Sequence, residues 1–385
     1  MEIAIDRERL AKTFTTLCEI DSPSQKEGNI SKYLKEKFTA LGADTIYEDD
    51  SAGKTGSESG NLIIRFNSRG GTGKGLFFCC HMDTVEPGTG VEVTRDGDIF
   101  TSKGDTILGG DDKSGIAAII EMLEVLRETG MAHPTIEVIL TTCEEIGLLG
   151  AKHLDYDQIQ TPYGYALDSS GINHVVVQAP AANKIDVEVK GLAAHAGLCP
   201  ENGINALALA AEALHNLKLG RLDAESSCNF GVIEGGVAAN IIPEKVVLRG
   251  EVRSHSAEKL KNYTDTITAT FEKTISGWQG DEHTGEHRPT VSINIDDDYP
   301  ALKLKQDEPV IARVSKGALL AGKELKYIQA GGGSDANIMT GRNLPTAIIA
   351  TGMSKVHTLE EQVDLNDLVV LTELLCGIAV AETGE

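Results

Sequence analysis

A histidine and an aspartate two residues apart, His81 and Asp83, directly follow an apolar run at 76–80 that has the length of a buried strand. Polar side chains at the end of such a strand lie where open α/β sheets place their ligands. Imidazole is a common zinc ligand, and a nearby carboxylate can accept the proton on its other ring nitrogen and so fix the tautomer. Taken alone, the pair is equally typical of a histidine beside a turn aspartate, because short motifs often match by chance.

Further acidic and histidine residues lie at the boundaries of predicted elements: Asp111, Glu144, Glu145, Asp168 and His357. Each has an ordinary explanation by itself, as a helix cap, a partner of a helix dipole, a turn acid or a surface histidine. Together, two imidazoles and three carboxylates suit zinc, with manganese or cobalt as substitutes; this set is His81, Asp111, Glu145, Asp168 and His357. Two ions that share one carboxylate would lie roughly 3.5–4 Å apart. Glu144 is not needed as a ligand and stands where a general base could take a proton from a metal-bridged water.

The charge balance excludes two classes of partner. The chain of 385 residues has 35 basic and 58 acidic residues and a formal net charge of −23. We therefore expect neither nucleic acid nor an anionic membrane as a partner, because the chain could not neutralise their phosphates. No apolar run approaches the roughly 20 residues that span a bilayer.

The cysteines and the first residues indicate a compartment. The seven cysteines are odd in number and lack CxxC spacing, and several lie in apolar runs, which is typical of reduced core residues. The first residues show no basic segment followed by an apolar one, so we expect no signal peptide. Both observations predict a cytoplasmic protein.

Two patterns of predicted elements divide the chain. Over 1–179, helical spacing alternates with strand-like runs, which is typical of a mostly parallel mixed sheet flanked by helices. Over 180–296 the order becomes βαββαβ, which is typical of a ferredoxin-like α+β unit. Residues 297–385 return to helix and strand, and the last helix is expected over 364–382. We therefore predict an α/β catalytic domain in two parts, 1–179 and 297–385, with a second domain inserted between them.

Four motifs and a late histidine resemble the dinuclear zinc peptidase family that includes peptidase T, carboxypeptidase G, aminoacylase and succinyl-diaminopimelate desuccinylase. The motifs are HMDTV at 81–85, GGDDKSGIA at 109–117, EEIGLLGA at 144–151 and LDSSG at 167–171. The resemblance covers nearly the whole chain in the family's order and is strongest to the peptidase T-like branch. It implies a zinc exopeptidase-like fold whose inserted domain serves as lid and dimerisation domain, and hence a homodimer.

The resemblance also implies how two Zn²⁺ ions would be held. Asp111 would bridge them. His81 and Asp168 would complete one site, and Glu145 and His357 the other. Co²⁺ or Mn²⁺ could substitute for zinc.

Three residues would act on the reaction. Asp83 would orient His81, and Glu144 would be the general base. His195, in the segment VKGLAAHAG, would stabilise the oxyanion from its own subunit or across a dimer interface. By its residues alone, His195 could equally be an ordinary turn residue.

Four residues match family positions that bind polar groups of the substrate: Asn240, Arg253, Gly332 and Gly333. Asn240 could instead mark a strand bulge, and Arg253 could be half of a strand-face ion pair. Peptidase T carries an arginine shortly before its glycine turn, whereas this chain reads Ile328-Gln329-Ala330 there. The resemblance therefore does not imply a strict preference for tripeptides.

The sequence thus predicts a peptidase T-like metallopeptidase, a tripeptide aminopeptidase-like hydrolase that cleaves the terminal peptide bond of short peptides. One alternative is an N-acyl amino acid amidohydrolase of the same fold, which would use the same metals and base. An alternative from another class is a metal-stabilised binding protein without catalysis. Glu144 and His195 argue against it, because binding alone needs neither.

Overall fold

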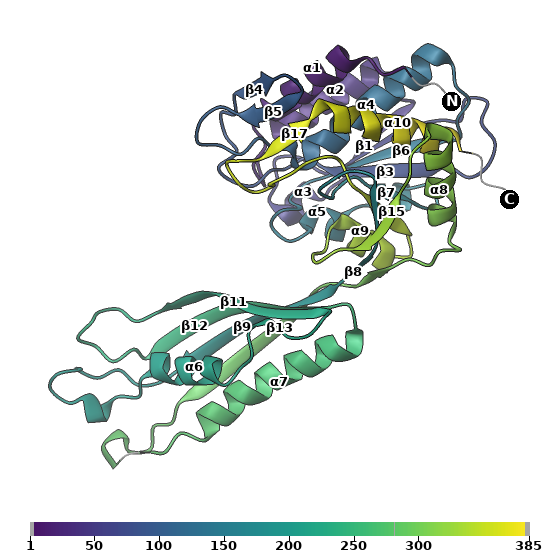
Figure 1. Cartoon of the computed structure of the whole chain (residues 1–385). Coiled ribbons are helices and arrows are strands. Elements are labelled where there is room, and N and C mark those ends of the chain that lie inside the picture. The colour runs from purple at the N-terminus through teal and green to yellow at the C-terminus, as the bar shows by residue number, and fades with distance from the viewer. Residues whose placement is uncertain (1–3, 281, 382–385) are drawn as a thin grey trace. The chain divides into compact units, whose positions relative to one another are not determined.

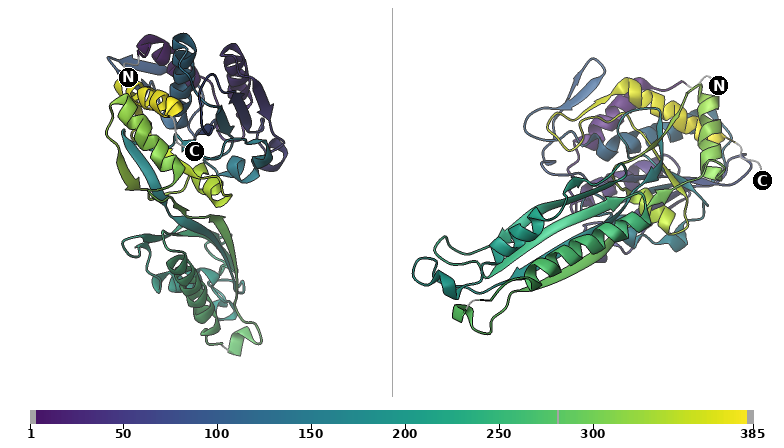
Figure 2. Two further views of the ribbon diagram at one scale, coloured as in Figure 1. Left: turned by 90° about the vertical axis from the view of Figure 1, so that its right-hand side faces the viewer. Right: turned by 60° about the horizontal axis from the view of Figure 1, so that its bottom comes forward.

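A computed structural model of the chain describes residues 4–280 and 282–381, and contacts group it into two compact units (Figures 1 and 2). The first unit consists of the chain up to Gln178, of Leu302–Ala330 and of the chain from Ser334 onward. The second consists of Ala179–Ala301 together with Gly331–Gly333. No helix in the described ranges is both long and apolar enough to cross a membrane.

The first unit is built on a mixed β-sheet, several strands of which are labelled in Figure 1. Its strand order is β1-β2-β6-β3-β7-β16-β8-β14, and β15 also pairs with β8. Its strands are β1 (Thr45–Glu48), β2 (Leu62–Phe66), β3 (Leu76–His81), β6 (Ile136–Thr141), β7 (Gly164–Ala166), β8 (His174–Ala179), β14 (Leu302–Lys303), β15 (Lys326–Gln329) and β16 (Thr346–Ile349). The neighbours β6, β3, β7 and β16 run parallel. Strand β2 pairs antiparallel with β1 and β6, and β8 pairs antiparallel with β16 but parallel with β15. Every residue of β3 and β6 is buried, as expected for strands covered on both faces.

Helices cover this sheet, and they confirm the predicted α/β class. They are α1 (Arg7–Cys18), α2 (Gly28–Ala40), α3 (Ala52–Thr55), α4 (Gly110–Thr129), α5 (Leu149–His153), α8 (Pro309–Ala321), α9 (Asp335–Gly341) and α10 (Leu365–Val380). Helices α1, α4 and α10 pack against one another, α4 also packs on β3, and α9 packs on β7 and β16. The last helix was expected to reach residue 382, which lies outside the described residues; α10 ends at Val380.

A small second sheet was not expected from the sequence. It has the order β17-β5-β4 and joins β4 (Val93–Asp96), β5 (Ile99–Ser102) and β17 (Gln362–Asp364). These strands have three or four residues each, too few to show a clear alternation, and β17 comes from a distant part of the chain. The pairing places the segment that precedes β17 close to the beginning of α4.

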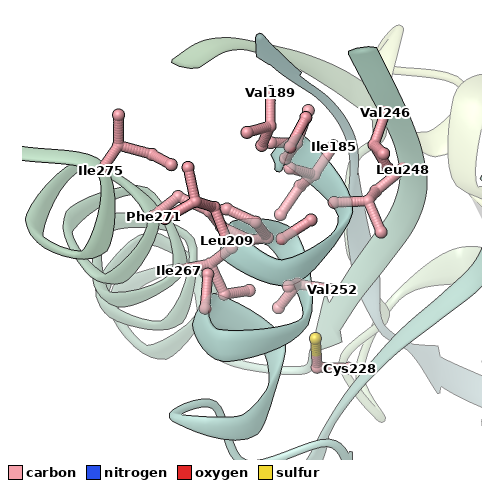
Figure 3. Packing of buried hydrophobic residues seen from close by; sticks show 14 of the residues in the cluster. Ile185, Val189, Leu209, Cys228, Val246, Leu248, Val252, Ile267, Phe271 and Ile275 are labelled. Carbon is pink, nitrogen blue, oxygen red and sulfur yellow. The ribbon is translucent and has the colours of Figure 1, made fainter. Parts of the chain in front are cut away.

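The second unit has a sheet of order β10-β11-β12-β9-β13, with α6 and α7 packed on it. Its elements are β9 (Ala181–Lys190), α6 (Ala206–His215), β10 (Gly220–Arg221), β11 (Ser226–Gly235), β12 (Lys245–Ser254), α7 (Ala257–Ser276) and β13 (Thr290–Tyr299). Figure 3 shows its core, in which Leu209 and Phe271 of the helices pack over Ile185 and Val252 of the sheet. The predicted βαββαβ order is present, with β10 as a short addition.

Candidate metal centre

The strand order brings the predicted ligands to one edge of the sheet. The parallel neighbours β6, β3, β7 and β16 all end at that edge, and each leads into a predicted site residue. His81 is the last residue of β3, and Glu145 follows β6. Asp168 follows β7, and His357 lies in the connection after β16. Asp111 comes from the first turn of α4, where its backbone angles are still non-helical.

Asp111 lies between the two histidines. His81 Nε2 is 3.0 Å from Asp111 Oδ1, and His357 Nε2 is 3.4 Å from Asp111 Oδ2. On its other side, His357 Nε2 is 3.1 Å from Glu145 Oε1. Ligand atoms of His81, Asp111 and Glu145 all lie within 4.8 Å of one another, close enough for the three residues to hold one metal ion. One carboxylate thus presents its two oxygens to two different imidazoles, as a bridging ligand does.

The tautomer of His81 fits a metal ligand. Its Nδ1 lies 2.9 Å from the main-chain oxygen of Asp83, so Nδ1–H is the donor. The Asp83 carboxylate, which the sequence analysis expected to orient the ring, is farther away, with Oδ1 3.6 Å from Nδ1. Neutral His81 therefore points the lone pair of Nε2 at a carboxylate oxygen, an arrangement that needs a proton or a cation between the two atoms.

The surrounding acids also fit a bound cation. Burial, reinforced by the charge of Asp111, raises the pKa of Asp168 to about 8. Burial and the charge of Asp168 raise the pKa of Glu144 well above its ordinary value. Hydrogen bonds to Asp111 and Glu145 raise the pKa of His357 to about 10. Carboxylates crowded this closely repel one another, and divalent ions on oxygen and imidazole ligands would relieve that repulsion.

The turn that carries both glutamates is held by two buried carboxylates. Asp83 Oδ1 accepts the main-chain N–H of Glu144 at 2.9 Å, and Asp83 Oδ2 accepts that of Glu145 at 3.2 Å. Glu27 Oε1 accepts the N–H of the preceding residue, Cys143, at 3.0 Å. Both carboxylates are fully buried. They accept the main-chain N–H groups of three successive residues and so fix the backbone of the turn.

In the second unit, His195 and Asn240 lie on neighbouring turns. The N–H of Ala196 donates to the main-chain oxygen of Asn240 at 2.9 Å, and His195 forms an isolated bridge with Ile241. His195 Nδ1 accepts the N–H groups of Gly197 and of the next residue at 3.2 and 3.1 Å. The ring proton of neutral His195 is therefore on Nε2, which leaves an exposed N–H donor.

Arg253 and the glycine turn also lie together in the second unit. Arg253 Nη2 donates to Glu251 at 2.9 Å, so the ion pair considered from the sequence is present. A Cβ on Gly332 would lie 3.4 Å from Arg253 Nη1. A Cβ on Gly333 would lie 2.3 Å from the ring of Tyr299, so a side chain at position 333 would clash with that ring. The predicted catalytic and metal-binding residues other than His195 belong to the first unit, and the predicted substrate-binding residues to the second.

Sequence reasoning missed three buried acids near the predicted ligands. Glu27 holds the turn before Glu144, and Glu361 accepts three amides of the loop that carries Asp111. Asp335 accepts the Thr141 hydroxyl at 2.5 Å, and burial raises its pKa to about 6. Nothing in the local spacing marks Glu27 or Glu361. Asp335 lies two residues after Gly333, a predicted substrate-binding residue, and this position is a signal by which it could have been found.

Comparisons with known proteins match this chain to one family. The model of peptidase family M20/M25/M40 matches residues 77–381. The uncharacterised protein YqjE of Bacillus subtilis is 38% identical over 375 residues, which cover 97% of this chain and 98% of that protein. The crystal structure of aminopeptidase PepT from Bacillus cereus is 37% identical, with a TM-score of 0.87, over 98% of this chain and 99% of that one. A tripeptidase structure from Staphylococcus aureus is 34% identical, with a TM-score of 0.88, over 98% of each chain.

Proposed function

The chain belongs to peptidase family M20/M25/M40 and is a metallopeptidase, and on this premise we propose that it is a peptidase T-like exopeptidase for short peptides. One observation carries the proposal. The two oxygens of Asp111 face His81 and His357, and His357 in turn faces Glu145. This pattern supports two metal ions that share a carboxylate, and we propose Zn²⁺ as the native metal because imidazole and carboxylate ligands suit it.

The proposed ligands divide into two groups around Asp111. His81 and Asp168 would complete one site, and Glu145 and His357 the other. When bound, the metals would acidify the attacking water toward a pKa of about 7 and polarise the scissile carbonyl.

Glu144 is the proposed general base. It follows β6 beside a proposed ligand, and its main-chain N–H is fixed by Asp83. Glu144 would accept the proton of the attacking water and pass it to the amine that leaves. Such proton transfer contributes about 10²–10⁴-fold to enzymatic rates.

His195 is the proposed oxyanion donor. Because Nδ1 accepts two amides, Nε2–H is the side of the ring available to a substrate. A preorganised N–H would stabilise the charge that develops on the carbonyl oxygen, and the loss of one such donor costs about 10²–10³ in rate.

We propose that the second unit binds polar groups of the substrate, at the place where Arg253 lies close to the turn of Gly332 and Gly333. Asn240 would add an amide near His195. We also propose that the second unit mediates a homodimer and that the enzyme works in the cytoplasm. The latter is supported by seven free cysteines, six of them buried.

A hydrolysis panel on zinc-loaded protein tests this function. We expect cleavage of di- or tripeptides with a free amino terminus and none of their N-acetylated forms. Cleavage of N-acyl amino acids alone would identify a deacylase instead. Metal binding without hydrolysis of any member of the panel would identify a binding protein and contradict the proposal.

A further inference from the structure

We propose that Glu361 is a positioning residue of the metal centre: its buried carboxylate sets the separation of Asp111 and His357 and thereby the affinity of the metal ion that they share with Glu145. This inference rests on the proposed metal centre. Glu361 is 1% exposed and is not itself a proposed ligand. Its role would be to fix the backbone of the two loops that carry Asp111 and His357.

Glu361 holds the loop that ends at Asp111. Its Oε2 accepts the main-chain N–H groups of Leu108 and Gly109, both at 2.9 Å. Its Oε1 accepts the N–H of Asp111 itself at 3.1 Å. Three amides thus converge on one carboxylate, and hydrogen bonds to a charged acceptor are shorter and stronger than neutral ones.

The loop packs so closely against Glu361 that a side chain at position 110 would not fit. A Cβ on Gly110 would lie 3.1 Å from Glu361 Oε1 and 2.7 Å from Cγ2 of Val363. Gly110 therefore permits the loop to approach both side chains closely. A change in the Glu361 carboxylate would be transmitted to Asp111 through the backbone.

Glu361 also lies at the base of the loop that carries His357. Ser354 and Gln362 exchange main-chain hydrogen bonds of 3.0 and 3.1 Å and close this loop. Within it, the N–H of Glu361 donates to the oxygen of Thr358 at 3.1 Å. His357 has a φ of +61°, an uncommon angle for a residue other than glycine, so its backbone has to be held in place by its surroundings.

These contacts connect the two proposed ligands through one residue, which holds the Asp111 loop with its carboxylate and the His357 loop with its main-chain N–H. Glu361 fixes the amide of Asp111 on one side and the base of the His357 loop on the other. The result is the 3.4 Å separation of His357 Nε2 and Asp111 Oδ2. Groups that orient metal ligands in this way typically contribute about 10–100-fold to metal affinity.

The substitution Glu361→Gln is a sharp test because it preserves size. The amide NH₂ would face either the N–H of Asp111 or the N–H groups of Leu108 and Gly109, so at least one hydrogen bond becomes a repulsive contact. Glu361→Asp keeps the negative charge, but its side chain is one methylene shorter, so the carboxylate lies farther from the three amides.

Glu137 offers a matched control. It is also fully buried and also accepts main-chain amides, those of Gln160 at 3.0 Å and Thr161 at 2.9 Å. It lies near the beginning of β6, whereas the metal centre follows the other end of that strand. Glu137→Gln therefore reports the cost of disturbing a buried carboxylate that holds no ligand loop.

The experiment measures Zn²⁺ bound per full-length chain against buffered free Zn²⁺, with the visible spectrum of the Co²⁺-loaded protein as a second readout. We expect the midpoint of one of the two ions to move about 10–100-fold higher in Glu361→Gln, with a changed cobalt spectrum. Glu137→Gln should melt at a lower temperature but keep both wild-type midpoints.

Wild-type midpoints and spectrum in Glu361→Gln would overturn the inference, whatever happens to its melting temperature. If that variant does not fold, Glu361→Asp decides by the same criterion. A wild-type chain that binds no metal at all would instead contradict the proposed function, so the two failures are distinguishable.

Discussion

The Asp83 carboxylate accepts the main-chain N–H of Glu144 at 2.9 Å. The ring of His81 is held differently, through a 2.9 Å hydrogen bond from Nδ1 to the main-chain oxygen of Asp83. One residue therefore positions a proposed ligand with its backbone and the proposed base with its side chain. A substitution that changes only the side chain should separate these two effects.

Replacing Asp83 by asparagine should lower kcat more than metal content. The new NH₂ group would oppose the N–H of Glu144 or Glu145 and displace the turn, while the main-chain bond to His81 stays. We expect kcat to fall about 10–100-fold with both metals retained. Steady-state kinetics and metal analysis of the same preparation check this. Loss of metal in proportion to activity would show that the carboxylate acts through the proposed ligands His81 or Glu145 and not through Glu144.

Replacing His195 by alanine should remove the oxyanion donor. We expect kcat to fall about 10²–10³-fold with KM and metal content little changed. His215, an exposed histidine at the end of α6 in the same unit, provides the control, and His215→Ala should keep wild-type kcat. Equal effects of the two substitutions would argue against the assignment of His195.

Removal of the metals should destabilise the fold as well as abolish activity. The crowded carboxylates of Asp111, Glu145 and Asp168 would then lose the cations that offset their repulsion. A ligand present at about 100 times its Kd stabilises the folded state by about 2.7 kcal/mol. We therefore expect chelated protein to melt at a lower temperature and re-addition of Zn²⁺ to restore both melting temperature and activity. A melting temperature that does not respond to chelation would argue against a metal centre formed by these residues.

Asp335 should make the stability of the metal-free protein depend on pH. Burial raises the folded-state pKa of Asp335 to about 6, whereas its pKa in the unfolded chain is near 4. The contribution of protonated Asp335 to the stability of the folded state is therefore complete below pH 4 and is lost as the pH rises through 6. Asp335→Asn cannot ionise. The unfolding free energy of the variant minus that of the wild type should therefore increase by about 2 kcal/mol between pH 4 and 7. Denaturant unfolding at several pH values in chelator measures it, and a difference independent of pH would contradict the assignment.

Much of the fold could be predicted because its signals are local. The apolar runs at β3 and β6 and the alternation in β9 indicate strands directly, and the βαββαβ order indicates the second unit. The proposed ligands were chosen from the same signals, since parallel strands end at one edge of the sheet. The short strands β4, β5 and β17 carry too few residues for such a pattern.

The supporting residues of the centre could not be predicted, for a physical reason. Glu27 and Glu361 act on backbone amides that are distant in the sequence, and neither has a neighbouring motif. Their spacing is that of ordinary surface glutamates until the tertiary fold buries them. The role of Asp83 was predicted toward His81, whereas its carboxylate contacts with Glu144 and Glu145 depend on how β3 and β6 pair.

The adjacent residues Glu144 and Glu145 test the central claim most directly, because they should separate catalysis from metal binding. In Glu144→Ala we expect turnover of a cleaved peptide to fall about 10²–10⁴-fold or more while two metal ions per chain stay bound. In Glu145→Ala we expect one ion to be lost together with activity. The measurement is metal content and kcat for both variants at the same free Zn²⁺. Wild-type turnover in Glu144→Ala, with its two metals in place, would contradict the account.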